Sequence, residues 1–394
     1  MNIEDPLLFI EINEINYNFI AGSFDGNQNF KIIEKISADN KSVNRTQFTN
    51  IEEASAIIKN NVEKIEKKLN YIFKYVTIII DNFDYSCVNI SGFKKLNGSQ
   101  VLKENISYIL NSLKLSINEN EEKESILHIF NSKSVLDGSI VENLPIGLFG
   151  DFYIHELSFF LIRENDLKNI NEVFNRSNLE IKKIFLKSFS EGVQLINKNT
   201  IETFFKIDIG KEQSKISYFD QASFRYTENF NFGSNIILKD IAKICSIDSD
   251  TITTLLSNKV FDNQKLDEND LVENKYFIKD NYRKIRKKLI LDIVNARVEE
   301  ITDIICNKNI NLKYLNKNNL KFYINVKDTL IENNFRYCFL KKFNKEAELM
   351  GDTAIEDLII GTSKLTTYGW KKEAIPIIQT KKSLITKIFK SIFG

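Results

Sequence analysis

The sequence predicts an α/β protein with two related halves, because one hairpin pattern occurs twice and strand-like and helical segments alternate between the two copies. The first hairpin covers residues 7–20 and turns at Asn13 and Glu14, with apolar side chains at alternate positions. The second covers residues 204–219 and turns at residues 210–213. In both hairpins the first strand carries an acid between two isoleucines, so we expect the halves to share one fold.

The segments between and after the hairpins each have an informative periodicity or composition. Apolar residues recur at helical spacing over 51–69 and are followed by a strand-like run at 75–80. Residues 137–151 gather glycine and proline, of which the chain has only 14 and 3, and predict a fixed irregular connection. A long amphipathic helix with a basic start is expected over 283–305, and a linker without periodicity over 366–380.

The composition excludes several classes of function. The 394 residues include 54 Lys and Arg against 53 Asp and Glu, so a formal charge of +1 gives no field that would gather nucleic acid. The 4 cysteines lie far apart without a C-x-x-C pair, which argues against a zinc site or a redox pair. The only histidines, His128 and His155, are too few for a histidine-based metal site or a Ser-His-Asp triad, and we expect both to be core or surface residues.

The sequence predicts neither a leader peptide nor a spanning helix. Residues 1–8 contain acids and lack the basic and apolar parts of a signal peptide. The longest apolar runs, such as 76–80 and 157–162, fall well short of the ~20 residues needed to cross a bilayer. We therefore expect a chain that stays inside the cell, with reduced thiols.

Residues 381–394 carry the clearest functional feature of the sequence. At ~100° per residue, the apolar side chains fall on one half of a helix and the polar ones on the other. The predicted membrane-binding residues are Leu384, Ile385, Ile388, Phe389, Ile392 and Phe393 on the apolar face, with Lys387 and Lys390 on the polar face. At ~1.5 Å per residue, ten residues reach about 15 Å, so this helix can lie on an anionic membrane but cannot span it. The alternative is a terminal helix that packs on the protein's own body or on another helix.

Several segments, in this order along the chain, resemble motifs of the FtsA family of bacterial cell-division proteins. That family consists of actin-like ATP-binding proteins that tie FtsZ filaments to the membrane. The two hairpins are similar to its two phosphate loops, and residues 137–150 resemble the return from its inserted subdomain. Residues 232–242 look like its G-x-x-x-T-x-D-I-A segment with one residue absent, and residues 293–301 are close to its I-I-x-x-R-V-E-E-I helix. The likeness runs over nearly the whole chain.

The resemblance implies an actin-like fold of two RNase H-like domains, in which a small inserted subdomain, 1C, replaces subdomain 1B of actin. A C-terminal amphipathic helix follows the two domains. The implied boundaries are 1–83 and 164–200 for domain 1A, 84–163 for 1C, 201–235 and 306–365 for domain 2A, 236–305 for domain 2B, 366–380 for the linker, and 381–394 for the membrane-targeting helix.

The resemblance also implies a cleft that binds ATP with Mg²⁺ between the two phosphate loops. The implied cofactor-binding residues are Glu11 and Asn13 in the first loop and Asp208, Gly210 and Lys211 in the second, with Asp208 holding the metal through water. These loops differ from the family pattern where phosphate binds, because hydroxyls, a lysine and glycines are missing.

In detail, Asn13 could adopt the positive φ of the missing glycine, but Glu14 places a negative charge near the phosphates. Residues 211–213 replace further glycines with larger side chains, and residues 322–327, where the adenine-side motif falls, contain no glycine. We expect weak nucleotide binding and little or no hydrolysis, so no enzyme. The alternative is a pair of ordinary hairpins with little nucleotide at all.

The implied function is to anchor FtsZ filaments to the cytoplasmic face of the inner membrane at the division site, with self-association into filaments and recruitment of later division proteins through 1C. The motif match places Arg297 and Glu300 on the site for the FtsZ C-terminal peptide, although an ion pair on a solvated helix face would explain the same residues. Alternative functions are an actin-like adaptor of pilus assembly and an actin-fold ATP-dependent enzyme such as a small-molecule kinase.

Overall fold

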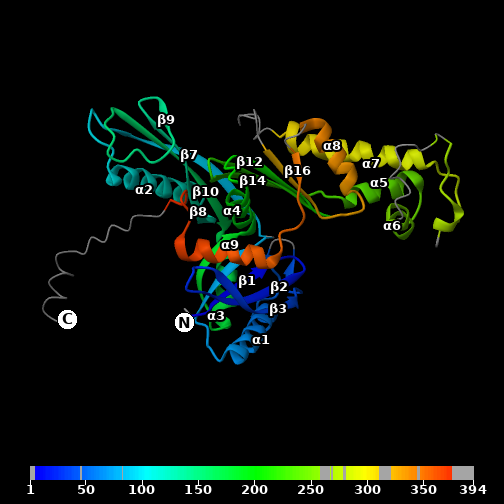
Figure 1. Ribbon diagram of the computed structural model, residues 1–394, viewed down its shortest axis with the longest axis horizontal. Coiled ribbons are helices and arrows are strands. Elements are labelled where there is room, and N and C mark those ends of the chain that lie inside the picture. Colours follow the sequence, from blue (N-terminus) through cyan, green and yellow to red (C-terminus); the bar gives the residue numbers. More distant parts are fainter. Residues whose placement is uncertain are drawn as a thin grey trace. The chain divides into compact units, whose positions relative to one another are not determined.

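The computed structural model describes residues 5–44, 47–81, 83–257, 267, 269–277, 281–309, 321–343 and 347–374. Contacts divide the chain into two units (Figure 1). The first unit consists of Met1–Ser86 and Asn169–Gly369, and the second of Cys87–Lys168 and Trp370–Gly394. The finer boundaries expected for 1A, 1C, 2A and 2B stay predictions.

The first sheet of the first unit has the strand order β11-β6-β1-β2-β3. Its strands are β1 (Leu7–Ile12), β2 (Asn16–Phe24), β3 (Phe30–Asp39), β6 (Tyr75–Ile80) and β11 (Glu180–Leu186). β1 forms an antiparallel hairpin with β2 and pairs in parallel with β6. Two short strands, β4 (Val43–Asn44) and β5 (Gln47–Phe48), form a separate ladder.

The second sheet repeats this topology in the order β14-β13-β12-β15-β16. Its strands are β12 (Phe204–Ile209), β13 (Ser214–Asp220), β14 (Ser223–Phe230), β15 (Lys321–Val326) and β16 (Ala347–Leu349). β12 forms an antiparallel hairpin with β13 and pairs in parallel with β15, as β1 does with β2 and β6. Both predicted hairpins are therefore confirmed, and the two halves share one topology.

Helix α1 (Ile51–Leu69) has the bounds that apolar periodicity predicts, and β6 follows it as expected. The Asn50 side chain accepts a hydrogen bond from the Glu53 amide at 3.0 Å and caps the start of the helix. Asn70 ends it with a left-handed φ of 49°. Local capping thus explains why this prediction is accurate.

Helices α4 (Lys187–Asn199) and α9 (Ile355–Tyr368) approach each other closely and α4 also contacts the second sheet. A Cβ on Gly192 would lie 2.0 Å from the Phe219 ring, and a Cβ on Gly361 would lie 2.7 Å from the Gln194 amide. The Gln194 side chain donates to the backbone carbonyl of Asp357 on α9. Glycine at these two positions therefore permits the close approach.

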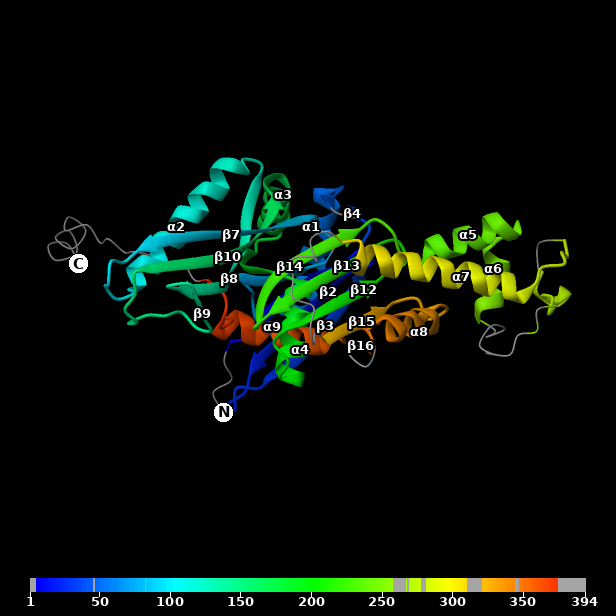
Figure 2. The same cartoon turned by 90° about the horizontal axis from the view of Figure 1, so that it is seen from above.

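Four further helices of the first unit pack on the second sheet. They are α5 (Asn235–Cys245), α6 (Ser249–Ser257), α7 (Lys287–Thr302) and α8 (Glu332–Phe343), with a 3₁₀ turn at Asn274–Tyr276 and a π-helical turn at Asp303–Asn307. Figures 1 and 2 show α5, α6 and α7 side by side at one end of this sheet. Buried aliphatic and aromatic side chains join these helices and the sheet in one hydrophobic core.

The predicted start of the long helix at residue 283 is wrong by four residues. The segment before α7 is extended, because the Val272 amide donates to the Ile285 carbonyl at 2.9 Å and the Lys287 amide donates to the Asp270 carbonyl at 2.8 Å. Backbone pairing with a distant segment therefore overrides the local helical pattern.

The second unit contains a sheet in the order β7-β10-β8-β9 with helix α2 (Lys103–Asn120) packed on it. The strands are β7 (Tyr85–Lys95), β8 (Glu124–Leu136), β9 (Ser139–Val141) and β10 (Phe152–Arg163), and α3 (Glu164–Arg176) follows β10. The expected irregular connection after β8 is present. It begins with Asp137 and Gly138 at φ values of 49° and 80°, and the Asp137 carboxylate accepts the Phe152 amide at 2.7 Å.

The predicted linker at 366–380 is wrong over its described part. Residues 366–368 continue α9, and Trp370–Ala374 lies in the second unit. The Asn131 amide donates to the Lys372 carbonyl at 2.7 Å, and the Ala374 amide donates to the Ile129 carbonyl at 2.8 Å. An open strand edge of β8 thus orders a segment that has no periodicity of its own.

Residues 375–380 and the predicted membrane helix at 381–394 lie outside the described residues. Within the described part of the chain, no helix combines the length and apolarity that a bilayer crossing requires.

Candidate functional site

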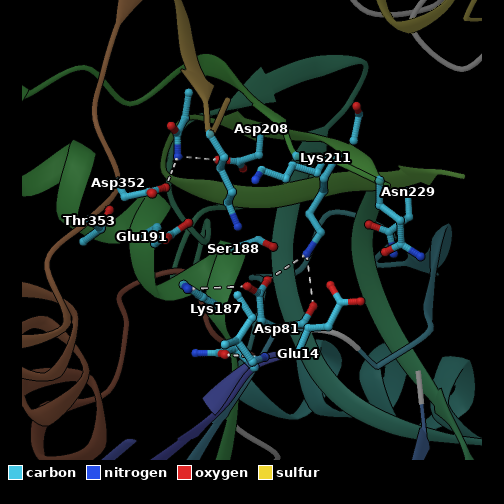
Figure 3. Close-up of a pocket in the computed structure, with 18 of the residues that line it drawn as sticks. Glu14, Asp81, Lys187, Ser188, Glu191, Asp208, Lys211, Asn229, Asp352 and Thr353 are labelled. Carbon is cyan, nitrogen blue, oxygen red and sulfur yellow. Dashed lines mark hydrogen bonds and ion pairs between the residues drawn. The ribbon is translucent and has the colours of Figure 1, made fainter. Parts of the chain in front are cut away.

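The two hairpin turns line one cleft in the first unit, with a cavity volume of about 700 Å³ (Figure 3). The ends of β6 and β15, the start of α4 and the segment before α9 complete the lining. All five residues predicted to bind the cofactor lie there, namely Glu11, Asn13, Asp208, Gly210 and Lys211. The structure thus brings the predicted site together, and the roles of its residues stay predictions.

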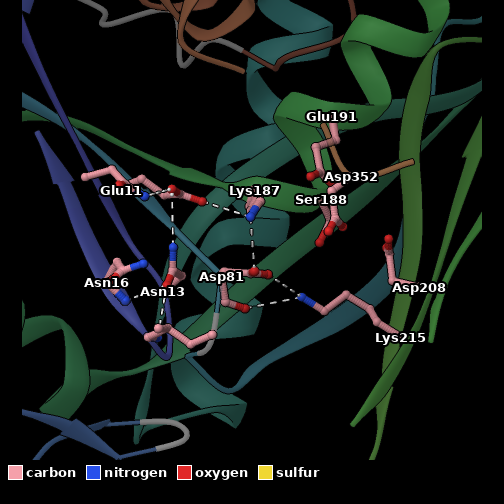
Figure 4. A network of polar contacts seen from close by, with 12 residues as sticks. Glu11, Asn13, Asn16, Asp81, Lys187, Ser188, Glu191, Asp208, Lys215 and Asp352 are labelled. Carbon is pink, nitrogen blue, oxygen red and sulfur yellow. Dashed lines mark hydrogen bonds and ion pairs between the residues drawn. The ribbon is translucent and has the colours of Figure 1, made fainter. Parts of the chain in front are cut away.

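A first network of charges joins Glu11 to Asp81 through a lysine (Figure 4). The Lys187 ammonium lies 2.8 Å from Glu11 Oε1 and 3.4 Å from Asp81 Oδ2. Lys215 Nζ lies 3.2 Å from the other Asp81 carboxylate oxygen. Burial opposes the charged form of Asp81, but the ammonium groups of Lys187, Lys215 and Lys327 hold its pKa below the usual range. Asp81 is therefore an anion already neutralised by the chain.

A second network surrounds Asp208. Lys206 Nζ lies 2.5 Å from each Asp208 carboxylate oxygen and 2.8 Å from Glu191 Oε2 on α4. The Lys206 side chain is only 2% exposed, against 18% for Asp208. Burial opposes both charges, yet the pairing raises the pKa of Lys206 and lowers that of Asp208. Asn325 also donates to Asp208 at 3.4 Å and to Asp352 at 2.7 Å.

The expectation that Asn13 adopts a positive φ is wrong, because Asn13 is absent from the left-handed residues of the described chain. Its side-chain oxygen instead accepts the Ile15 amide at 3.0 Å and the Asn16 amide at 2.8 Å, which closes the turn without left-handed backbone. The Asn13 amide donates to the Asn16 carbonyl at 3.1 Å. Three amides of this turn are therefore used within the turn and do not point to a phosphate.

The second turn is closed against the start of α5. The Ser234 amide donates to the Gly210 carbonyl and the Asn235 amide donates to the Lys211 carbonyl, both at 2.9 Å. A Cβ on Gly233 would lie 2.3 Å from the Gly210 carbonyl oxygen, so the two segments are in direct contact. The turn itself occupies the first amides of this helix.

These contacts do not fit a magnesium–nucleotide complex. The described cleft lining has eight carboxylates and four lysines, a formal charge of −4 that repels phosphate. The described chain contains no cluster of three or more His, Cys, Asp and Glu residues placed to hold a metal. Lys206 further neutralises the one carboxylate that was expected to orient Mg²⁺.

The predicted partner residues lie on α7, away from the cleft lining. Arg297 Nε lies 2.5 Å from Asp240 Oδ2 on α5, and Arg297 Nη1 lies 2.6 Å from Glu300 Oε2. The ion pair that the alternative interpretation expects is therefore present, and it also joins two helices. The Arg297 side chain is 28% exposed, so it is still accessible to a partner.

The sequence analysis missed the charged residues that pair in the cleft, namely Asp81, Lys187, Glu191, Lys206 and Lys215, and the amide donor Asn325. One signal was available. Lys206 stands between Phe205 and Ile207 in a strand whose one other charged residue is Asp208, two positions on and therefore on the same face. Asp81 and Lys187 directly follow strands, where polar groups gather at the sheet edge.

Comparison with known proteins relates this chain to cell-division proteins by sequence. No protein-family model matches it. It is 19% identical over 242 residues to FtsA of Buchnera aphidicola, covering 61% of this chain and 57% of that protein. It is 20% identical over 290 residues to FtsA of Neisseria meningitidis, covering 73% of this chain and 69% of that protein. The chain thus matches little more than half the length of the Buchnera protein.

Comparison with solved structures establishes the fold. A chain of the PilM-PilN type IV pilus biogenesis complex aligns with a TM-score of 0.52 and 9% identity, covering 93% of this chain and 97% of that one. Two sheets of equivalent topology, each built on a hairpin that turns into a shared cleft, are the core of this architecture. The chain is an actin-fold protein that resembles FtsA.

Proposed function

We propose that this protein is an actin-like scaffold of bacterial cell division that anchors FtsZ filaments to the inner face of the cytoplasmic membrane. The observation that carries this proposal is the similarity to curated FtsA proteins over 61% and 73% of the chain. The amphipathic pattern at 381–394 supports membrane attachment, because it supplies six apolar side chains and flanking lysines to one surface.

The scaffold acts by binding, and its ATP affinity is weak. Phosphoryl transfer depends on positioned donors and on charge stabilisation around the phosphoryl group. In this cleft three amides of the first turn are used internally, and Asp81 and Asp208 are paired with lysines. We expect negligible hydrolysis for the same reason.

The proposed partners are the FtsZ C-terminal peptide, further copies of this chain and later division proteins. The guanidinium of Arg297 on α7 is permanently charged and can donate two hydrogen bonds to a carboxylate or carbonyl of the peptide. Glu300 lies on the same helix face. Self-association would strengthen membrane attachment, because each further tail in a filament binds at high effective concentration.

An actin-like adaptor of pilus assembly is the second candidate, favoured by the alignment with 97% of a chain in the PilM-PilN complex. Fluorescence anisotropy with a labelled FtsZ C-terminal peptide separates the two functions. Saturable binding that Arg297→Glu weakens supports the division scaffold, whereas absence of binding favours the pilus adaptor.

Membrane attachment is tested by co-sedimentation of the full chain with phosphatidylglycerol vesicles. Phe389→Glu places a charge on the apolar face and should release the protein, whereas Ser391→Glu makes the same charge change on the polar face and should retain most binding. Lys387→Gln should weaken binding modestly, and more so at low salt. Sedimentation of Phe389→Glu at the wild-type level would show that the tail packs on protein instead.

A further inference from the structure

We propose that the Lys206 ammonium serves as a built-in cation that closes the cleft of the first unit, so that neither Mg²⁺ nor nucleotide is needed to hold it closed. This inference concerns the cleft alone and goes beyond the proposed scaffold function.

The first argument is the geometry around Lys206. Its ammonium lies at 2.5, 2.5 and 2.8 Å from three carboxylate oxygens, two from Asp208 on β12 and one from Glu191 on α4. An ammonium has three donors, and three acceptors surround this one, so its hydrogen-bonding capacity is filled. A divalent cation commonly joins carboxylates from different elements in this way.

The second argument is burial. The side chains of Lys206 and Glu191 are 2% and 11% exposed, so water contributes little to their solvation. A buried carboxylate pair without a counter-ion is strongly unfavourable, and a cation must be present in some form. Lys206 fills that requirement from within β12, and its ammonium occupies the carboxylate oxygens that Mg²⁺ would use as ligands.

The third argument is a parallel link on the other side of the cleft. Lys215 on β13 of the second sheet reaches Asp81 at the end of β6 in the first sheet, with Nζ at 3.2 Å from Oδ1 and also from the backbone carbonyl. Lys187, the first residue of α4, contacts the same Asp81 at 3.4 Å. Lys215 and Lys187 therefore join both sheets and α4 at Asp81 (Figure 4). Lys206 joins β12 to α4 at a second place.

The test replaces the internal cation by an external one. Lys206→Met keeps roughly the length of the side chain and removes its charge. Lys198→Met on α4, outside the cleft lining, removes an exposed pair with Asp357 and is the matched control. Binding of Mn²⁺ to the full-length proteins is measured by electron paramagnetic resonance. Tm is measured without added metal and with about 5 mM MgCl₂, a large excess over the protein.

The expected result is that Lys206→Met lowers Tm by about 5 °C or more, regains much of that loss with Mg²⁺, and binds Mn²⁺ at least tenfold more tightly than the wild type. Wild type and Lys198→Met should show neither metal binding nor a metal-dependent Tm. Wild-type binding of Mn²⁺ that Asp208→Asn removes would overturn the proposal, as would a folded Lys206→Met with unchanged Tm and no gain of metal.

If Lys206→Met does not fold, hydrogen exchange of the wild type decides the question. Amides of 187–194 and 206–216 should be protected equally with and without Mg-ATP, whereas protection that appears only with Mg-ATP contradicts a cleft closed by lysine. These outcomes do not depend on vesicle or peptide binding. A failure of the proposal that Lys206 closes the cleft can therefore be distinguished from a failure of the proposed scaffold function.

Discussion

The two hairpins of the first unit place an acid at the same position and neutralise it in different ways. In β1, Glu11 lies opposite Asn18, which donates to it at 2.7 Å, and its counter-ion Lys187 comes from α4. In β12, Asp208 lies opposite Lys215, and its closest counter-ion is Lys206, two residues earlier on the same strand.

The position that holds Lys206 in β12 holds Phe9 in β1, and Phe9 packs edge-on against Phe30 with ring centroids 5.5 Å apart. Equivalent backbones therefore carry an apolar contact in one half and a buried cation in the other. The comparison teaches that the repeat preserves topology, whereas the charge balance of the cleft is particular to each half.

The largest effect should come from making the second hairpin resemble the first at this position. Lys206→Phe leaves Asp208 and Glu191 buried without their shared cation, and we expect a loss of about 3–5 kcal/mol in the free energy of unfolding. Denaturant titration followed by circular dichroism measures the loss. The double variant Lys206→Phe with Asp208→Asn should recover part of it, and full stability of the single variant would contradict the role of the pair.

The sheet of the second unit offers a contrast, because it buries a neutral histidine where the cleft buries ion pairs. Burial lowers the pKa of His155, which is 1% exposed, to about 4 from an unfolded value near 6.5. The unfolded chain therefore binds the proton first, so stability is present above pH 6.5 and is lost as pH falls toward 4, by about 3 kcal/mol in all.

Replacing His155 with Phe should remove this pH dependence between 6.5 and 4, which hydrogen exchange of β8 and β10 amides can follow. The depressed pKa of Asp81 predicts a separate loss of stability in the first unit, which begins as pH falls through the ordinary carboxyl pKa of 3.8 and continues at more acidic pH. Equal slopes in wild type and His155→Phe would show that the histidine does not control acid stability of the second unit.

A smaller effect is expected for the ion pair outside the cleft. Arg297 is 28% exposed, so Arg297→Gln should lower the free energy of unfolding by only about 1 kcal/mol, mostly through loss of the bond to Asp240 on α5. Because the guanidinium is proposed to contact the FtsZ peptide, the same variant should weaken peptide binding more than Glu300→Gln does. Equal peptide affinity in both variants would indicate that the peptide binds at another surface.

The sequence was sufficient for the elements whose signals are local. Both hairpins follow from alternation, and α1 follows from its periodicity and its cap at Asn50. Pairing between distant segments explains what was missed. The extended start before α7 and the Trp370–Ala374 segment, which bridges to β8 at Glu373, are ordered by backbone partners that no local pattern reveals.

The same limit applies to the site. Glu11 and Asp208 were found because they lie in repeated hairpins. Lys187 and Asp81 come from other elements, and Lys215 of the second hairpin meets Asp81 only in the fold. The turn at Asn13 was predicted with the wrong backbone, because a side-chain oxygen can close a turn that a glycine would otherwise make. Charge pairing in the cleft is thus a tertiary property.

The central claim is that the chain's own lysines neutralise Asp81 and Asp208 and hold the cleft closed. Calorimetric titration of the full-length protein with Mg-ATP tests it most directly. The account predicts no binding tighter than the high micromolar range and no heat that depends on Mg²⁺. A submicromolar dissociation constant that requires Mg²⁺ and is abolished by Asp208→Ala would contradict it.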